Sequence, residues 1–247
     1  TVVLERAGDV IPKVVKVFPN LRAGSEKEIK IPKKCPICGG EVKKVEGEVA
    51  YRCGNKNCYA VNLRRLMHWA SKGALNIEGL GPKIIEQLIK EGLARDVSDF
   101  YVLTVGDMEP LERFAEKSAD NLARAIAEKK EAPLEKIIYG LGIRHVGEET
   151  AITLVKEIGR LGNWKIGKLE DVIRIIQKIT LEQLEKMPDV GPIVAKSIYD
   201  WFYDKRNLEL LRKLERNGVK TKSEKLKAGR EKLRGIKGKT FVLTGAL

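Results

Sequence analysis

Four cysteines gathered in a short segment are the residues of this chain best suited to chemistry. Two residues separate Cys35 from Cys38, fourteen residues follow, and four residues separate Cys53 from Cys58. The surrounding Gly and Asn residues, in CPICGG and CGNKNC, let backbone N–H groups point at thiolate sulfur. Four thiolates at tetrahedral positions suit Zn²⁺, which has no redox chemistry and prefers soft ligands. The spacing therefore predicts a closed site with a structural zinc ion.

Two other uses of these cysteines remain as alternatives. A pair of disulfides fits poorly with a chain that shows no secretion signal. A redox Cys-x-x-Cys site would not need the second pair of cysteines. Because so short a segment has almost no hydrophobic core of its own, we expect its folding to depend on metal binding.

The charge of the chain indicates a polyanionic partner. Its 247 residues carry 47 Lys and Arg against 34 Asp and Glu, a formal net charge of +13. Such an excess causes self-repulsion unless a partner such as nucleic acid relieves it. Thermophile proteins are also rich in Lys and Glu, but that explains a surplus of one sign less well. Since no apolar run approaches the ~18–20 residues that span a bilayer, we expect a cytoplasmic monomer without a membrane partner.

The elements that must position these groups divide the chain into five stretches. Hydrophobic residues make up 43% and aromatic residues 6%, a balance that favours helix-rich domains with a buried core. The stretches are short strands and a linker over 1–32, the cysteine segment over 33–62, a helical pattern over 63–221, a basic linker over 222–234 and a single strand over 235–247. A single strand is not stable alone, so we expect both ends to be cuts through larger domains.

The helical stretch contains a repeat. Four segments share a short turn followed by a helix, near residues 77–88, 111–122, 143–154 and 187–198. Aligned on the last small residue of the turn, they place four residues at one position: Gly81, Ala115, Gly147 and Gly191. This is the helix-hairpin-helix pattern h-x-x-h-x-G-h-G-x-x-x-A, in which bare N–H groups at a helix start form an anion site. The repeat therefore predicts binding to DNA phosphates without sequence specificity.

The four copies are not equally suited to bind phosphate. The first, with Gly79, Leu80 and Gly81 followed by Lys83, is predicted to bind best, whereas the second lacks both glycines and is predicted to pack against protein. The residues predicted to contact DNA in the third and fourth copies are Arg144, His145, Val146, Gly147, Asp189, Val190 and Gly191, with Asp189 weakening its site. In the alternative interpretation each Gly only ends one helix before the next, which four copies on a basic chain disfavour.

The cysteine segment followed by LRRLMHWASKGALNIEGLG resembles bacterial NAD-dependent DNA ligases. In that family an OB-fold barrel is followed by a four-cysteine zinc finger, four helix-hairpin-helix motifs and a BRCT domain. ERAGDVIPKVVKV resembles the end of the barrel, and LRGIKGKTFVLTGAL resembles the start of the BRCT domain. The resemblance implies a mainly α multidomain fold with a small β-barrel remnant and the start of an α/β domain. It also implies that the four cysteines bind zinc and that the hairpins bind the DNA backbone.

The resemblance further implies an enzyme that seals nicks between a 5′-phosphate and a 3′-hydroxyl in duplex DNA, in replication and repair. The reactive lysine of that family lies in a Lys-x-Asp-Gly motif, which this chain lacks. We therefore expect NAD⁺ and Mg²⁺ to bind outside this chain, and no catalytic residue within it. The chain alone is expected to be inactive and to clamp nicked DNA for an adenylation domain in cis. The alternative is a non-enzymatic helix-hairpin-helix module of another repair or junction-processing protein.

Overall fold

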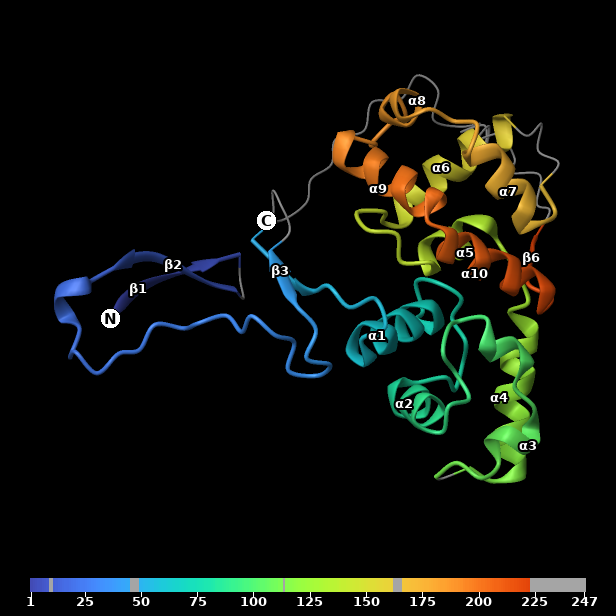
Figure 1. The fold of residues 1–247 in the computed structure, drawn as a ribbon, viewed down its shortest axis with the longest axis horizontal. Helices are drawn as coiled ribbons and strands as arrows, with labels where there is room; N and C mark the ends of the chain where they lie inside the picture. Colours follow the sequence, from blue (N-terminus) through green and yellow to red (C-terminus); the bar gives the residue numbers. More distant parts are fainter. Residues whose placement is uncertain (9–10, 45–48, 113, 162–165, 223–247) are drawn as a thin grey trace, which may run out of the picture. The chain divides into compact units, whose positions relative to one another are not determined.

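A computed structural model of the chain describes residues 1–8, 11–44, 49–112, 114–161 and 166–222 (Figure 1). It divides into two compact units, Thr1–Asn55 and Lys56–Leu247. The expected BRCT start and all of the expected basic linker except Lys222 lie outside the described residues. Within the described residues, no helix is long and apolar enough to cross a membrane.

The first unit is built from two antiparallel strand pairs. Strand β1 (Val2–Ala7) pairs with β2 (Ile11–Val17), and the 3-10 helix η1 (Pro19–Leu21) follows. Further along, β3 (Val42–Lys44) pairs with β4 (Tyr51–Cys53). Apolar side chains of β1 and β2 are exposed, among them Leu4 and Ile11 at 58% and 70%. A two-stranded sheet of this kind is at best marginally stable alone, and the hydrophobic core lies in the second unit.

The second unit is mostly helical, as predicted. Its elements are α1 (Tyr59–Ala70), α2 (Pro82–Lys90), η2 (Asp99–Val102), α3 (Val105–Met108), α4 (Glu116–Glu128), β5 (Glu131–Ala132), α5 (Leu134–Gly140), α6 (Glu148–Leu161), α7 (Leu169–Ile176), α8 (Leu181–Glu185), α9 (Pro192–Tyr203), α10 (Lys205–Arg216) and β6 (Lys220–Thr221). Helices joined by the predicted hairpin turns pack on each other: α1 on α2, α3 on α4, α5 on α6, and α8 on α9 (Figure 1).

The four repeats bury the same positions, which explains the apolar spacing of the sequence. Apolar residues three and four apart lie on one face of a helix, and that face must turn inward. The residue that opens each turn is at most 8% exposed: Ile77, Leu111, Ile143 and Met187. The fourth residue after the aligned turn position is at most 1% exposed: Ile85, Ala119, Ala151 and Ala195.

The four turns also share their backbone hydrogen bonds. In each turn the N–H of the apolar residue donates to the carbonyl three residues earlier: Leu80 to Ile77 at 3.3 Å, Phe114 to Leu111 at 3.1 Å, Val146 to Ile143 at 3.1 Å, and Val190 to Met187 at 3.2 Å. The carbonyls of the aligned residues Gly81, Ala115, Gly147 and Gly191 each accept from the N–H four residues later, at 2.9–3.0 Å. The repeat seen in the sequence is therefore a repeat of one backbone structure.

A close approach at the end of α5 makes Gly140 sensitive to substitution. A Cβ at this position would lie 2.9 Å from Leu75 Cδ2 and 3.0 Å from Trp69 Cε3. Trp69 is fully buried, and its indole N–H donates to the Tyr101 hydroxyl at 3.1 Å. We expect Gly140→Ala to lower the free energy of unfolding by about 1–3 kcal/mol, because packed side chains must shift.

Denaturant unfolding followed by circular dichroism measures this effect. Gly167→Ala is the matched control, since a Cβ at Gly167 meets nothing within 4 Å. We expect the control to change the free energy of unfolding by less than about 0.5 kcal/mol. Equal losses in the two variants would show that packing around Gly140 is not tight.

A short parallel pair ties the end of the helical region to its middle. β5, which precedes α5, pairs with β6, which follows α10. The N–H of Lys220 donates to the Lys130 carbonyl at 2.7 Å, and that of Lys222 donates to the Ala132 carbonyl at 2.9 Å. The buried Thr221 hydroxyl donates to the Ile166 carbonyl at 2.9 Å. The segment after α10 is thereby held between elements that lie far apart in the sequence.

Candidate metal centre and nucleic-acid interface

The structure brings the four predicted cysteines together. The sulfur atoms of Cys35, Cys38, Cys53 and Cys58 all lie within 4.8 Å of one another. No disulfide joins these four cysteines. Cys38 Sγ and Cys53 Sγ lie 3.4 Å apart, well beyond the ~2.05 Å of a disulfide bond. Zinc–sulfur bonds of about 2.3 Å place the sulfurs of a tetrahedral site roughly 3.8 Å apart. The cluster therefore fits a zinc ion.

Two tight turns position the first pair of cysteines. The Cys35 N–H donates to the Gly40 carbonyl at 2.7 Å, and the Gly39 N–H donates to the Cys35 carbonyl at 2.8 Å. Gly39 has a φ of +69°, which favours glycine. At Gly40 a Cβ would lie 2.9 Å from the Asn55 Cβ and 3.3 Å from Cys38 Sγ. The two glycines of CPICGG are thus needed to close the chain around the sulfurs.

The last cysteine stands at the start of the first long helix. Cys58 is fully buried, and its carbonyl accepts the first helical hydrogen bond of α1, from the Asn62 N–H at 2.9 Å. The helix therefore begins inside the segment that the sequence predicted as the metal-binding stretch. Four thiolates would fill a tetrahedral coordination sphere and leave no position for a water or a substrate, which is the arrangement of structural zinc.

The aligned glycines of the hairpin turns face open space. A Cβ built on Gly81, Gly147 or Gly191 would meet nothing within 4 Å. Gly81 and Gly191, the N-cap residues of α2 and α9, have almost the same backbone angles, with φ of −83° and −79° and ψ of 173° and 174°. Neither position requires glycine for its backbone conformation. Their lack of a side chain instead leaves room for another molecule at the helix start.

The residue two positions before the aligned glycine has the same backbone conformation in the first, third and fourth turns, whether or not it is glycine. Gly79, His145 and Asp189 have φ of +82°, +62° and +61°. The first turn, which keeps this glycine, was predicted to bind phosphate best, whereas the third and fourth turns have His145 and Asp189 in its place. The structure shows the same left-handed turn at both, in a conformation that Asp and His adopt more readily than most residues. Arg113, the corresponding residue of the second turn, lies outside the described residues.

Several first-turn amides are available for an incoming anion. Within the described residues, the N–H groups of Lys83, Gly147, Gly191 and Ile193 have no hydrogen-bond partner. The Gly81 N–H, by contrast, donates to the Gly79 carbonyl at 3.0 Å. Unsatisfied N–H groups at a helix start, together with the helix dipole, favour a bound anion.

The apolar residues of the turns, which the sequence predicted to contact DNA, are buried in the protein. Leu80, Val146 and Val190 are 4%, 7% and 3% exposed, and their N–H groups are bonded within the turn. They hold the turn against the core and present no side chain to solvent. Seven other predicted residues lie at the surface, exposed or half-exposed: Gly79, Gly81, Lys83, His145, Gly147, Asp189 and Gly191. Arg144 is only partly exposed, and its Nε and Nη2 atoms are buried.

Acidic residues at the helix starts distinguish the copies electrostatically. α2 and α9 have no acidic residue in their first turn, whereas α6 begins with Glu148 and Glu149. Glu148 forms an ion pair with Lys136 at 3.1 Å. Carboxylates compete with a phosphate for the positive end of the helix. The third turn is therefore less suited to bind phosphate than the first and fourth turns. The sequence Gly-Glu-Glu directly after Val146 could have indicated this difference.

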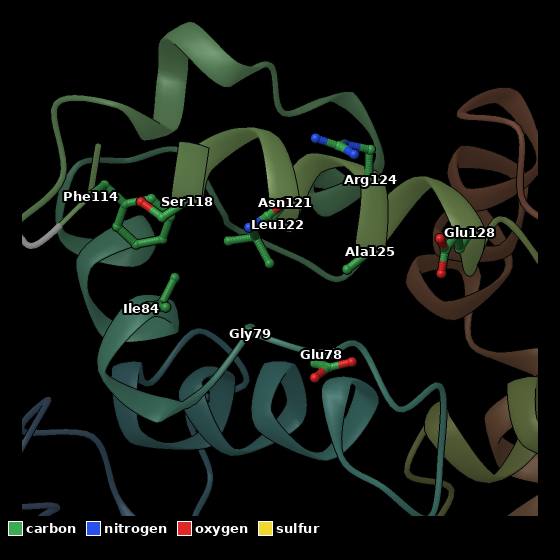
Figure 2. A pocket seen from close by; sticks show the side chains of 10 residues that line it. All are labelled: Glu78, Gly79, Ile84, Phe114, Ser118, Asn121, Leu122, Arg124, Ala125 and Glu128. Atoms are coloured by element: carbon green, nitrogen blue, oxygen red, sulfur yellow. The ribbon is translucent and has the colours of Figure 1, made fainter. Parts of the chain in front are cut away.

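The second turn is built into the protein. The Ala115 N–H donates to the Ser118 hydroxyl at 2.8 Å, and Glu116 occupies the first turn of α4. Figure 2 shows Phe114 and Ser118 at the start of α4, facing Ile84 of α2 across a cavity of about 570 Å³. The Ala115 N–H is thereby bonded within the turn, and the half-buried Phe114 ring packs against the hydrophobic core. These contacts favour the expectation that the second turn packs against protein.

The comparisons with known proteins agree with this geometry. Residues 34–60 match the family model of the NAD-dependent DNA ligase C4 zinc finger domain, and residues 136–211 match that of the helix-hairpin-helix motif. The whole chain aligns at 45% identity with 32% of the DNA ligase of Aquifex aeolicus (strain VF5), and at 43% with 34% of that of Geobacter sulfurreducens. It also aligns at 40% identity with 34% of the DNA ligase of Rubrobacter xylanophilus.

Residues 34–60 are thus similar to a ligase-type C4 zinc finger, and residues 136–211 to helix-hairpin-helix motifs. Along its whole length the chain is homologous to DNA ligases, and the resemblance that the sequence indicated is confirmed. The chain spans about a third of the length of the curated relatives it matches.

Proposed function

We propose that this chain is the DNA-binding part of an NAD-dependent DNA ligase, and that it grips nicked duplex DNA by its backbone. One observation carries the proposal: the turns ending at Gly81, Gly147 and Gly191 share one backbone structure, have an open side, and offer free amides at or just beyond the glycine. The net charge of +13 supports a polyanionic ligand.

In this proposal, each open turn receives a phosphate oxygen at the start of its second helix. The N–H groups of Lys83 at the first turn, Gly147 at the third, and Gly191 and Ile193 at the fourth donate to it, and the Lys83 ammonium adds charge. These donors contact the DNA backbone and not the base edges, so binding carries no sequence information. Zn²⁺ on the four cysteines supports the fold of residues 34–60 and takes no part in the reaction.

The remaining steps belong to the longer protein that the relatives indicate. We propose that an adenylation domain in cis binds NAD⁺ and Mg²⁺ and carries the reactive lysine, while this chain contributes no catalytic residue. The β1–β2 pair, with apolar side chains exposed, would belong to an OB-fold barrel, and residues 235–247 would begin a BRCT domain. The protein would act in the cytoplasm as a monomer, in replication and repair.

Binding to nicked duplex DNA tests the proposal. We expect affinity independent of base sequence that falls steeply between about 50 and 200 mM salt, because each neutralised phosphate contributes about −0.9 to the slope of log K against log salt. Fluorescence anisotropy with labelled duplexes of two unrelated sequences measures both quantities. An affinity that hardly changes with salt would contradict phosphate contacts.

A nick-joining assay separates the ligase from a free-standing DNA-binding module. We expect no joining by this chain alone and restored joining when an adenylation domain of an NAD-dependent ligase is added with NAD⁺ and Mg²⁺. If the chain binds DNA but never stimulates joining by that domain, the alternative of a non-enzymatic repair or junction-processing module is favoured.

A further inference from the structure

The second unit contains a basic groove at some distance from the hairpin turns. A cavity of about 850 Å³ is bounded by the start of α1, the loop after α2 and the start of α10. Its lining includes the basic residues Lys56, Arg65, Arg95, Lys205, Arg206 and Lys213, against the acidic residues Asp96 and Glu209. These residues come from three separate parts of the sequence, and we call the cavity that they line the α1–α10 groove.

The acidic side chains around this groove already form ion pairs within the protein. Asp96 binds Lys213 at 3.0 Å, and Glu209 binds Arg216 at 2.6 Å. At the rim, Asp204 binds Lys56 at 2.7 Å. The hydrogen bond from the Lys56 ammonium lowers the pKa of the Asp204 carboxyl, and the hydrogen bond to Asp96 raises the pKa of Lys213. In each of these two pairs both side chains are therefore charged at neutral pH, and their opposite charges compensate each other.

Four cations of the groove have no acidic partner. Within the described residues, the exposed side chains of Arg65, Arg95, Lys205 and Arg206 form no ion pair. Like charges brought together in this way repel one another unless a polyanion lies between them. The groove thus has an uncompensated positive charge that nothing in the described chain satisfies.

The backbone that carries these cations is fixed, although the side chains are free. The Asn62 side-chain amide donates to the Arg95 carbonyl at 2.9 Å, which holds the loop after α2 against α1. Asp204 caps α10 and accepts from the Arg206 N–H at 2.9 Å. The cations therefore extend from a rigid frame around the cavity, which favours a ligand with several regularly spaced charges.

We propose that the α1–α10 groove binds the phosphate backbone of DNA, at a site separate from the hairpin turns. Small-molecule sites bury most of their ligand in a largely apolar pocket, whereas these four cations are exposed, as suits a polymer that passes through. The loop that lines the groove follows the end of α2, whereas Gly81 stands at the start of that nine-residue helix, and nine residues span roughly 13 Å. The proposal rests on the proposed DNA-binding function.

The ring of Tyr59 gives the groove a second feature suited to nucleic acid. Tyr59 lines the groove and is 43% exposed. Exposed aromatic rings in a basic groove can stack on the bases of a single strand. The groove can therefore take the backbone of a duplex or of an unpaired strand, and the experiment includes both.

Charge reversal in the groove tests the proposal on the complete 247-residue chain loaded with zinc. The variant Arg65→Glu with Lys205→Glu is compared with Arg64→Glu with Lys156→Glu, which makes the same change in net charge at exposed residues that do not line the groove. Affinity is measured by anisotropy on nicked duplex and on single-stranded DNA over a range of salt. Circular dichroism and zinc content check the fold of each variant.

We expect the groove variant to bind at least one of the two DNAs about tenfold more weakly than the matched control, with a salt slope smaller by about two. The milder variant Arg65→Gln with Lys205→Gln should show the same trend, which keeps the test valid if charge reversal disturbs folding. Equal binding by groove and control variants on both DNAs would overturn the proposal. If the groove and control variants bind equally while the wild type binds with the expected salt dependence, only the groove proposal fails and the proposed DNA-binding function stands. If the wild type does not bind DNA, the groove proposal and the proposed function both fail.

Discussion

Removal of zinc is expected to unfold the cysteine segment, residues 34–60, and to leave most helices of the second unit folded. The sulfur atoms of the four cysteines lie within 4.8 Å of one another, and in a segment with so little core the metal is what holds them together. The strand pair β3–β4 in this segment has three residues in each strand, too few to form a core. The helices, by contrast, bury a continuous apolar cluster of their own.

The variant Cys58→Ser is the sharpest form of this prediction. Cys58 is fully buried and is the N-cap residue of α1, so this variant removes a metal ligand while serine remains a favourable residue at the helix start. We expect loss of bound zinc by elemental analysis, and loss of dispersed backbone NMR signals from the segment, because metal binding contributes on the order of 10 kcal/mol to the folding of such sites. A purified chain with no zinc, whose thiols oxidise reversibly, would contradict a structural metal and favour a redox site.

Replacing Gly81 by Val is expected to weaken DNA binding uniformly, by about 10- to 100-fold. Gly81 has a φ of −83° and open space where a Cβ would stand, so the variant should fold with a cost of no more than about 1 kcal/mol at this N-cap position. The added methyl groups would occupy the place proposed for the phosphate. Hydrogen bonds to a charged group contribute about 1.5–3 kcal/mol each, which corresponds to this loss of affinity.

The second turn provides a matched control for this prediction. Ala115 occupies the position of Gly81, but it already carries a methyl group, and Glu116 follows it in the first turn of α4, whereas the first turn of α2 has no acidic residue. Ala115→Val should therefore leave DNA affinity within about twofold. If both variants lose affinity equally, or if the loss at Gly81 depends on base sequence, the turns do not act as backbone contacts.

Local patterns predicted the helices and turns because each repeat is a short stretch of chain. The apolar spacing around Gly81, Gly147 and Gly191 reflects buried positions three and four residues apart, which the structure bears out. The cysteine cluster was predictable for the same reason, since its four ligands lie within twenty-four residues, from Cys35 to Cys58. Such features need no knowledge of how distant segments meet.

Features that depend on distant contacts or on fine backbone geometry could not be predicted. The α1–α10 groove joins Arg65, Arg95 and Lys205, residues up to 140 positions apart. Likewise, the residue types His145 and Asp189 do not establish that both adopt the left-handed conformation of a turn glycine, although Asp and His adopt it more readily than most residues. The tertiary fold imposes these conformations, since isolated residues of these types seldom adopt them.

The β5–β6 pair has a consequence for the energetics of association. By fastening the segment after α10 to the connection between α4 and α5, it restrains the first two hairpins relative to the last two. We expect this restraint to limit changes in the distances between the open turns, so that less conformational entropy is lost when several turns bind at once. We accordingly expect the helical region to bind its ligand at several turns at once without a large conformational change.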